Sequence, residues 1–444
     1  MWSPAIRRCS RVSNRWDSVP VWSPARRRRE RWRICALEYS VCFPTPDKGV
    51  VPMNSNDVLV VGGGMVGAAV AVDLGRRGIP VRLLEARPAT RPTADEPPRL
   101  RVSALNGRSI EYLQSLGAWP ALDQARVATF DELATWDISA PGRLAFSADE
   151  LGLDRLGVFV ENDHLQAALL ETAAGLESVR LDVPAPTLDV QPGTDGPRLI
   201  LEGEGALTPA LTVAADGAGS RLRDAAGIGV WEGDYHQHAV VATVQPNPPA
   251  GTRTWQRFTP DGPQALLPLA GGAASLVWYV SPSKARLLTA MSEADFVDAV
   301  ESAFPTDLGL IDQVYGRGSF PIRRLHAQRY WRDQLVLVGD AAHVIHPLAG
   351  QGVNIGLRDA RALAGQIAES LRRGLPAAYP TGLAAYERGR RPDNQLMQSA
   401  MSAFHVGFTA PLGPLAPVRG LGLQIAGHGG WLKRRVLRYA MEGR

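Results

Sequence analysis

Residues 57–85 decide the fold, and they read DVLVVGGGMVGAAVAVDLGRRGIPVRLLE. Val58–Val61 is a short, apolar and β-branched run, which is typical of a strand buried in a parallel sheet. A glycine-rich turn follows, and apolar residues then recur at helical spacing as far as Gly78, where basic residues and a glycine end the helix. Val81–Leu84 is a second apolar run. The stretch therefore predicts a strand, a helix and a second, parallel strand.

The turn after the first strand has the G-x-G-x-x-G spacing in Gly62, Gly64 and Gly67. In such a turn the first glycine allows the bend, the second lets a pyrophosphate approach, and the third lets helix and strand pack closely. The pyrophosphate would lie on the free amides at the positive end of the helix. Glu85 lies 18 residues beyond Gly67. Its carboxylate can accept both hydroxyls of an adenosine ribose and would repel a 2′-phosphate. The stretch predicts a site for FAD or NAD rather than NADP, and a glycine-rich turn without a ligand is the alternative.

Composition and charge narrow the class of protein. The chain has 444 residues, of which 45% are hydrophobic and 21% charged, so it can bury a large core in two or three interwoven lobes. The basic balance lies in residues 1–52, whose net charge is +7, whereas residues 53–444 carry −3. This distribution argues against a nucleic-acid partner. All three cysteines lie before residue 53, which excludes a disulfide framework, a cysteine-ligated metal and a redox-active C-x-x-C from the remaining chain. A cytoplasmic location is consistent with this.

Residues 1–52 form an arginine-rich leader without periodicity. Three interpretations compete: a transit peptide of the mitochondrial type, a basic tail on a membrane surface, and upstream sequence translated in error. Met53 stands just before the first strand, as in a nucleotide-binding domain with a short N-terminus. We therefore expect the leader to lack packed structure and to lie outside the functional protein. No apolar run is long enough to span a membrane without interruption by glycine or charge, and no signal peptide is evident.

Two later motifs follow short apolar strands. Leu211–Ala214 leads to Asp216 and Gly217, which places a carboxylate and a flexible backbone at the carboxyl edge of a sheet. A simple Asp-Gly turn is the alternative. Residues 335–338 lead to GDAAHVIHPLAGQGVN at 339–354, and an amphipathic helix then runs as far as Gly374.

The third motif has features that can bind a flavin ring carrying negative charge. Gly350, Gln351 and Gly352 present free amides and a helix dipole, which fit the N1–C2=O edge of a reduced flavin. Asp340, at the end of a strand, can hold the ribityl chain. His343 and His346 are three residues apart but have no third ligand nearby, so we predict no metal site.

Three further features each leave two interpretations. Arg101 can reach a phosphate or flavin, or can be a solvated arginine. The aromatic runs 254–259 and 274–280 can line a pocket for an apolar ligand, or can be an ordinary sheet core. The basic segment 431–440 can lie on an anionic bilayer, or can dock on its own domain.

Taken together, the motifs at 62–85, 216–217 and 339–354 resemble those of the FAD-dependent aromatic hydroxylases, which have the fold of p-hydroxybenzoate hydroxylase. Within that family, RVSAL at 101–105, VEN at 160–162 and HPLAGQGVN at 346–354 are similar to the bacterial ubiquinone-biosynthesis hydroxylases. Residues 254–263, together with 274–279, are most similar to the branch of 3-demethoxyubiquinol 3-hydroxylases. The resemblance covers residues 57–440.

The resemblance implies a two-lobe α/β fold in three parts. A Rossmann-like FAD-binding domain would comprise residues 53–130, 155–232 and 325–375. A β-sheet substrate domain, comprising 131–154 and 233–324, would be interleaved with it, and a C-terminal helical region would follow at 376–444.

The resemblance also implies the chemistry. NAD(P)H would visit the cleft near Asp216 and Gly217 without a Rossmann domain of its own, and reduced flavin with O2 would form a C4a-hydroperoxide that hydroxylates an electron-rich ring, such as a polyprenylated quinol or phenol. The sequence singles out no side-chain base, so we name no catalytic residue. The residues expected to bind the cofactor are Gly62, Gly64, Gly67, Glu85, Arg101, Asp216, Gly217, Asp340, Pro347, Gly350, Gln351, Gly352 and Asn354.

Several alternatives stay open at this point. The chain could be a sibling hydroxylase that acts at another ring position, a hydroxylase of another aromatic or polyketide substrate, or a dehydrogenase of the same fold. A flavin-binding scaffold without turnover, within a membrane-associated biosynthetic complex, is a different class of function. A polyprenylated substrate would also fit a peripheral location on the inner membrane.

Overall fold

The computed structural model describes residues 57–139, 143–193, 196–346, 350 and 352–409, with side chains as far as residue 403. The predictions for residues 1–52, for Pro347, for Gln351 and for the tail beyond residue 409 lie outside the described residues.

A six-stranded sheet forms the centre of one lobe, in the order β18-β19-β12-β1-β2-β8. All its neighbouring strands are parallel except the terminal pair β18 and β19. The strand–helix–strand unit predicted at residues 57–85 is present at its centre, because β1 and β2 pair in parallel and are joined by a helix. The strands of this sheet are β1 (Val58–Val61), β2 (Val81–Leu84), β8 (Val179–Asp182), β12 (Leu211–Ala214), β18 (Trp331–Arg332) and β19 (Leu335–Leu337).

Helices pack against the six-stranded sheet and against one another. The helix between β1 and β2 packs against this sheet, against the helix before β8 and against the long helix after the third motif, and buried apolar residues fill the space between them. The last described helix packs beside that long helix. The helices of this lobe are α1 (Met65–Arg76), α2 (Gly107–Ser115), α3 (Asn162–Ala174), α4 (Arg221–Ala225), α7 (Gly352–Arg372) and α8 (Pro380–Thr409).

An eight-stranded sheet forms the second lobe, in the order β20-β17-β13-β16-β15-β14-β5-β6. It is antiparallel except between β14 and β5. Its strands are β5 (Glu132–Asp137), β6 (Arg143–Ser147), β13 (Val230–Asn247), β14 (Arg253–Thr259), β15 (Gly262–Pro268), β16 (Ala274–Val280), β17 (Leu310–Ala327) and β20 (His343–Val344).

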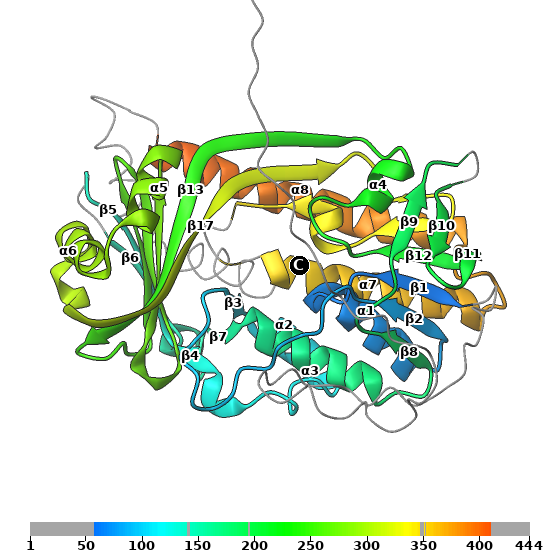
Figure 1. The fold of residues 1–444 in the computed structure, drawn as a ribbon, viewed down its shortest axis with the longest axis horizontal. Coiled ribbons are helices and arrows are strands. Elements are labelled where there is room, and N and C mark those ends of the chain that lie inside the picture. The colour runs from blue at the N-terminus through cyan, green and yellow to red at the C-terminus, as the bar shows by residue number, and fades with distance from the viewer. Residues whose placement is uncertain (1–56, 140–142, 194–195, 347–349, 351, 410–444) are drawn as a thin grey trace, which may run out of the picture. The chain divides into compact units, whose positions relative to one another are not determined.

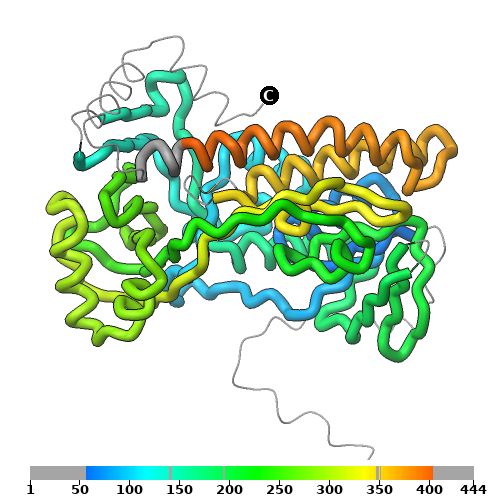
Figure 2. The backbone as a smooth tube through the Cα atoms, turned by 90° about the horizontal axis from the view of Figure 1, so that it is seen from above, coloured from blue at the N-terminus to red at the C-terminus, as the bar shows by residue number. Residues whose placement is uncertain are grey.

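The strands β13 and β17 connect the two lobes. Each has 18 residues, and they pair from Val230 with Ala327 to Asn247 with Leu310. Figure 1 shows both strands running from the eight-stranded sheet across to the lobe of the six-stranded sheet, and Figure 2 shows α8 running along them. The two lobes are therefore joined by continuous strands.

Two helices in the second lobe depart from the sequence-based expectation of a sheet domain over 233–324. They are α5 (Pro282–Ala290) and α6 (Glu293–Ala303), and they pack on one face of the sheet through Ala285, Leu288, Phe296 and Val300. The opposite face of the sheet is thus free of these two helices.

Two small sheets complete the described chain. One, in the order β3-β7-β4, brings the strand after Arg101 beside the strand before α3. The strands of the small sheets are β3 (Val102–Leu105), β4 (Ala128–Phe130), β7 (Gly157–Glu161), β9 (Leu188–Gln191), β10 (Arg198–Leu201) and β11 (Gly205–Leu207). The expected α/β architecture is confirmed.

Candidate functional site

The turn between β1 and α1 has room for glycine alone at two of its three motif positions. Gly62 has a φ of 101°, and a Cβ there would lie 2.3 Å from the carbonyl oxygen of Ala215. A Cβ on Gly67 would lie 1.9 Å from the carbonyl oxygen of Gly62. In contrast, a Cβ on Gly64 would have no described atom within 4 Å. The space above Gly64 is therefore open, as a site for a pyrophosphate requires.

Glu85 follows β2 and contacts this turn. Its Oε2 atom accepts a hydrogen bond from the Gly63 amide at 2.6 Å, and its Oε1 atom accepts one from the Arg87 amide at 2.9 Å. On the other side, Nε2 of Gln166 donates to the carbonyl oxygen of Gly63 at 3.0 Å. These hydrogen bonds hold the carboxylate against the glycine turn, and an acidic residue at the end of the second strand is the usual partner of an adenosine ribose.

The second motif lies directly beside the first. β12 pairs with β1, and the Ala215 amide donates to the Val61 carbonyl at 2.8 Å. The Oδ1 atom of Asp216 is buried and has no hydrogen-bond partner among the described residues. Gly217 has a φ of 84°, and a Cβ there would meet no described atom within 4 Å. An unsatisfied buried carboxylate oxygen beside open space is what a site for a hydroxyl-bearing ligand provides.

The third motif packs against the first through a single valine. A Cβ built on Gly339 would lie 3.3 Å from the side chain of Val66 in α1. A Cβ built on Gly356 of α7 would lie 2.4 Å from the Cγ2 atom of the same valine. The starts of α1 and α7 are therefore in contact. The second and third motifs are also linked, because Arg223 donates hydrogen bonds to the carbonyl oxygens of both Ala218 and Ala341.

Asp340 lies close enough to Arg101 for the charge of the guanidinium to act on its carboxyl. Solvent still reaches the Asp340 side chain. Nearby protein atoms nevertheless displace part of the water around its carboxyl, and this desolvation raises the pKa of the carboxyl. Electrostatic attraction to His343 and Arg101 acts in the opposite direction. The guanidinium carbon of Arg101 also lies 5.5 Å from the ring centre of Phe320 in β17. Arg101 thus extends between the sheet lobe and the turn that carries Asp340.

Asn354 is buried, and its amide connects α7 to the segment after Arg101. Its Oδ1 atom accepts hydrogen bonds from the Asn106 amide at 3.1 Å and from the Ser109 hydroxyl at 2.7 Å. Its Nδ2 atom donates to the carbonyl oxygen of Ala104 at 2.8 Å. In the structure this side chain therefore orients the start of α7, and its contact with a cofactor stays a prediction.

The glycines at the start of α7 differ in their surroundings. Gly350 has a φ of 60°, and a Cβ there would approach the Cβ of Ala104 to 3.2 Å. Gly352, the first residue of α7, would place a Cβ in space where no described atom lies within 4 Å. None of the described residues therefore fills the space beside Gly352.

One face of the eight-stranded sheet is turned toward the third motif. Its apolar side chains, which we call the apolar wall, are Ala239, Val241, Val277, Tyr279 and Ile322. The ring of His346, immediately before Pro347, stacks on Tyr279 with ring centres 5.4 Å apart. It also meets the Tyr235 ring edge-on at 4.7 Å. The wall therefore lies against the segment that leads into α7.

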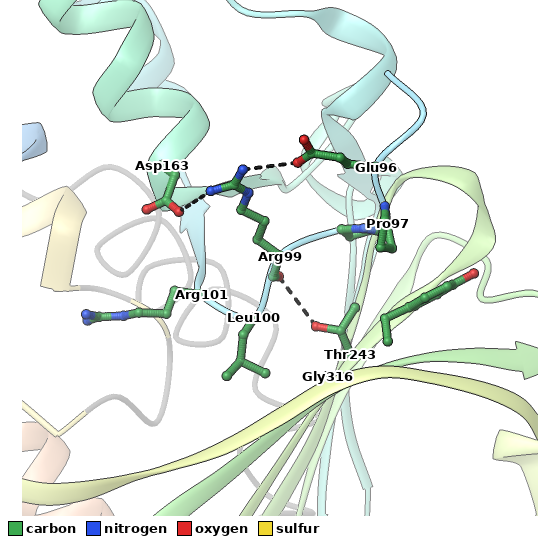
Figure 3. A pocket seen from close by; sticks show the side chains of 10 residues that line it. Glu96, Pro97, Arg99, Leu100, Arg101, Asp163, Thr243 and Gly316 are labelled. Atoms are coloured by element: carbon green, nitrogen blue, oxygen red, sulfur yellow. Dashed lines mark hydrogen bonds and ion pairs between the residues drawn. The ribbon is translucent and has the colours of Figure 1, made fainter. Parts of the chain in front are cut away.

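A cavity of about 440 Å3 lies beside the segment that ends at Arg101. Its entrance is ordered by Arg99, which donates to Glu96 at 3.0 Å and to Asp163 at 3.1 Å, while its carbonyl oxygen accepts from Thr243 (Figure 3). Figure 3 also shows Arg101 pointing away from Thr243. Sequence reasoning did not identify this cavity, because its lining comes from segments that are distant in the chain.

The residues present fit FAD. The open glycine turn and Glu85 suit an adenosine diphosphate, and the unsatisfied oxygen of Asp216 and the open start of α7 suit the other half of the same molecule. A metal site finds no such support, since the described residues include no group of three or more histidine, cysteine, aspartate or glutamate side chains that could hold an ion.

Comparisons with known proteins agree with this geometry. The FAD binding domain family matches residues 55–400. The 3-demethoxyubiquinol 3-hydroxylase of Escherichia coli (strain K12) is 41% identical over 386 residues, which span 87% of this chain and 98% of that relative. The ubiquinone hydroxylase UbiL of Rhodospirillum rubrum is 34% identical over 392 residues, which span 87% of this chain and 89% of that relative.

Solved structures show the same fold. PqsL of Pseudomonas aeruginosa, in complex with 2-aminobenzoylacetate, has a TM-score of 0.69 at 25% identity and covers 83% of this chain and 98% of its own. The p-nitrophenol 4-monooxygenase PnpA of Pseudomonas putida DLL-E4 has a TM-score of 0.69 at 19% identity and covers 86% of this chain and 96% of its own. The chain therefore belongs to the FAD-dependent monooxygenases of the FAD binding domain family, and within them to the group that contains the ubiquinone-biosynthesis hydroxylases.

Proposed function

We propose that this enzyme hydroxylates the ring of a polyprenylated quinol in ubiquinone biosynthesis, and that its reaction is the 3-hydroxylation of 3-demethoxyubiquinol. The observation that carries the proposal is the apolar wall, which contacts the segment leading into α7 through the stacking of His346 on Tyr279. A flat, apolar and electron-rich ring fits between an apolar sheet face and a flavin site. The identity to a relative of that name supports the specific substrate.

The proposed cofactor residues form two groups, one for the adenosine diphosphate and one for the flavin end of FAD. Gly62, Gly64 and Gly67 would receive the pyrophosphate, and Glu85 would receive the adenosine ribose. Asp216 and Asp340 would accept hydrogen bonds from hydroxyls of the ribityl chain. The start of α7 would stabilise negative charge on the reduced flavin ring. Bound FAD supplies the oxygen chemistry once NAD(P)H has reduced it.

The chain's own contribution is orientation and exclusion of water. Tyr279 is buried, and that burial raises the pKa of its hydroxyl, so the phenol stays neutral beside the substrate. The surrounding alanine and valine side chains offer no hydrogen bonds to water, which protects a reactive oxygen species from side reactions. Because the chain has a single dinucleotide fingerprint, we propose that NAD(P)H docks transiently near Gly217 and the neighbouring arginines.

We further propose a cytoplasmic location with peripheral contact to the inner membrane, in or beside a ubiquinone-biosynthesis complex. Within the described part of the chain, no helix combines the length and apolar character needed to cross a membrane. A polyprenylated quinol partitions into lipid, so the enzyme would meet its substrate at the bilayer surface.

The proposal is tested with purified protein, NAD(P)H, 18O2 and a short-chain 3-demethoxyubiquinol. We expect faster NAD(P)H oxidation when the quinol is added, and a product that contains one labelled oxygen at ring position 3. A labelled product hydroxylated at another ring position would refute the 3-hydroxylation and show that the enzyme catalyses a related hydroxylation of the same ring. Consumption of NAD(P)H that yields only hydrogen peroxide with every such quinol would refute the proposal.

A further inference from the structure

A carboxylate lies fully buried in the middle of α7, away from the open start of that helix. Asp359 has no solvent exposure, yet four donors surround its two oxygens. Oδ2 lies 2.5 Å from Nε2 of His343 and 3.4 Å from the Gly339 amide. Oδ1 accepts from Nε of Arg390 at 2.8 Å and from Nδ2 of Asn394 at 3.0 Å.

These four partners come from two different structural units. Gly339 and His343 flank the short turn that carries Asp340. Arg390 and Asn394 lie on α8, where the Arg390 guanidinium also donates to the Asn394 oxygen at 2.6 Å. Asp359 is therefore the point at which α7, α8 and the Asp340 turn are joined.

The charge on Asp359 is retained despite its burial. Burial alone would raise the pKa of this carboxyl, but the positive charges of His343 and Arg390, together with the hydrogen bonds, hold it well below its usual range. The same partnership raises the pKa of Arg390 against the effect of its own burial. Asp359 and Arg390 thus form a hydrogen-bonded ion pair at neutral pH.

We propose that Asp359 is a positioning residue for the flavin, which acts by holding the Gly339–His343 turn so that Asp340 faces the site. The inference rests on the proposed function in one respect, namely that Asp340 binds the cofactor. A buried ion pair contributes little net stability compared with apolar residues of the same size. Its hydrogen bonds do fix geometry, because they bind the two ends of one turn to a helix.

Replacement of the carboxylate tests this role. In Asp359→Asn the single amide oxygen cannot accept from all four donors, so the bonds to the turn or those to α8 are lost. We expect the dissociation constant for FAD, measured by quenching of flavin fluorescence, to rise at least tenfold. We also expect at least a threefold larger share of NAD(P)H electrons to appear as hydrogen peroxide.

Glu204→Gln is the matched control. Glu204 also pairs with a buried arginine, since it accepts from Arg82 at 2.6 and 2.8 Å. It lies between β10 and β11, and its side-chain hydrogen bonds to described residues go to Arg82 and Arg180, neither of which is a proposed cofactor residue. We expect it to lower the thermal midpoint like Asp359→Asn and to bind FAD like the wild type. Equal FAD affinity in Asp359→Asn and the wild type, or an equal loss in Glu204→Gln, would overturn the inference.

A double variant separates position from stability. Asp359→Asn breaks one of the two ion pairs of the buried Arg390 guanidinium and leaves it paired with Asp393 alone. Adding Arg390→Met removes this guanidinium, so the double variant should regain part of the lost thermal stability. FAD should still bind weakly, whereas recovery of affinity along with stability would show a purely structural role. Asp340→Asn distinguishes the two proposals. If it weakens FAD binding and Asp359→Asn does not, the inference about Asp359 fails and the assignment of Asp340 stands. If only Asp359→Asn weakens binding, the assignment of Asp340 fails, and with it the inferred action of Asp359 through Asp340.

Discussion

At the scale of single residues, Gly64 and Gly67 separate ligand binding from folding. A methyl group on Gly64 would enter open space, so Gly64→Ala should change the free energy of unfolding of the cofactor-free protein by only about 0.5 kcal/mol. It should weaken FAD binding at least tenfold, because the methyl group takes the place of the pyrophosphate. Gly67→Ala should destabilise the cofactor-free protein by about 3 kcal/mol, because its methyl group would meet the Gly62 carbonyl.

Urea unfolding and flavin fluorescence measure the two effects. If Gly64→Ala destabilised the cofactor-free protein as strongly as Gly67→Ala, the assignment of open space above Gly64 would be wrong.

His326 should make the protein sensitive to acid. It is buried, and neither ring nitrogen has a hydrogen-bond partner among the described residues. Burial, with added repulsion from the charges of His343 and Arg391, lowers its pKa to about 4. An unfolded histidine has a pKa near 6.5, so the unfolded state binds more protons between pH 6.5 and 4. Stability is therefore complete above pH 6.5 and falls by about 3 kcal/mol as the pH decreases to 4.

Urea unfolding at several pH values checks this. His326→Gln should flatten the loss of stability between pH 6.5 and 4, whereas His236→Asn, whose histidine side chain is 89% exposed, should leave it unchanged. An identical pH profile in wild type and His326→Gln would contradict the account.

The residues that the sequence identified are those with local signatures. Gly62, Gly67 and Glu85 stand at fixed spacings along one strand–helix–strand unit, and the backbone geometry there requires them. Asp359 and His326 carried no such signal. Asp359 is one of several polar residues in an amphipathic helix. Its partners, Arg390 and the Gly339–His343 turn, are brought to it only by the tertiary structure.

Among the secondary-structure elements, α7 should depend on Asn354 for its attachment to the segment 104–109. It bonds Ala104, Asn106 and Ser109, so Asn354→Ala would leave several buried groups unpaired, each costing about 1 to 3 kcal/mol. We expect a loss of about 3 kcal/mol or more in the free energy of unfolding, together with weaker FAD binding. Gln191→Ala, which removes an exposed hydrogen bond, should have little effect on either. Wild-type stability in Asn354→Ala would show that α7 is held by other contacts.

Elements differ in how far the sequence could predict them. The parallel strands β1, β2 and β12 were predictable, because each is a short apolar run that ends in a turn signal. Helices α5 and α6 were missed, although Ser281 and Ser292 cap them through their hydroxyls and Pro282 occupies the first turn of α5. Aromatic strands on either side obscured those local signals. The bridge formed by β13 and β17 was not predictable, because strand length is set by pairing between residues about 80 positions apart.

At the scale of the whole molecule, the proposed membrane contact makes a prediction about the full chain. Because residues 431–440 form a basic segment, the full chain should sediment with vesicles that contain anionic phospholipid and should be released by high salt. A chain that ends at residue 409 should sediment less while retaining FAD. Equal sedimentation of both chains would locate any membrane contact elsewhere, and sedimentation of neither would refute it.

The central claim is that three motifs, distant in sequence, hold one FAD because α1 and α7 begin side by side at Val66. A crystal structure of the FAD complex tests it most directly. We expect continuous density for one molecule, with the adenosine ribose at Glu85, the pyrophosphate above Gly64 and the isoalloxazine at the start of α7 against the apolar wall. Density that placed the isoalloxazine away from Gly352, or the ribose away from Glu85, would contradict it.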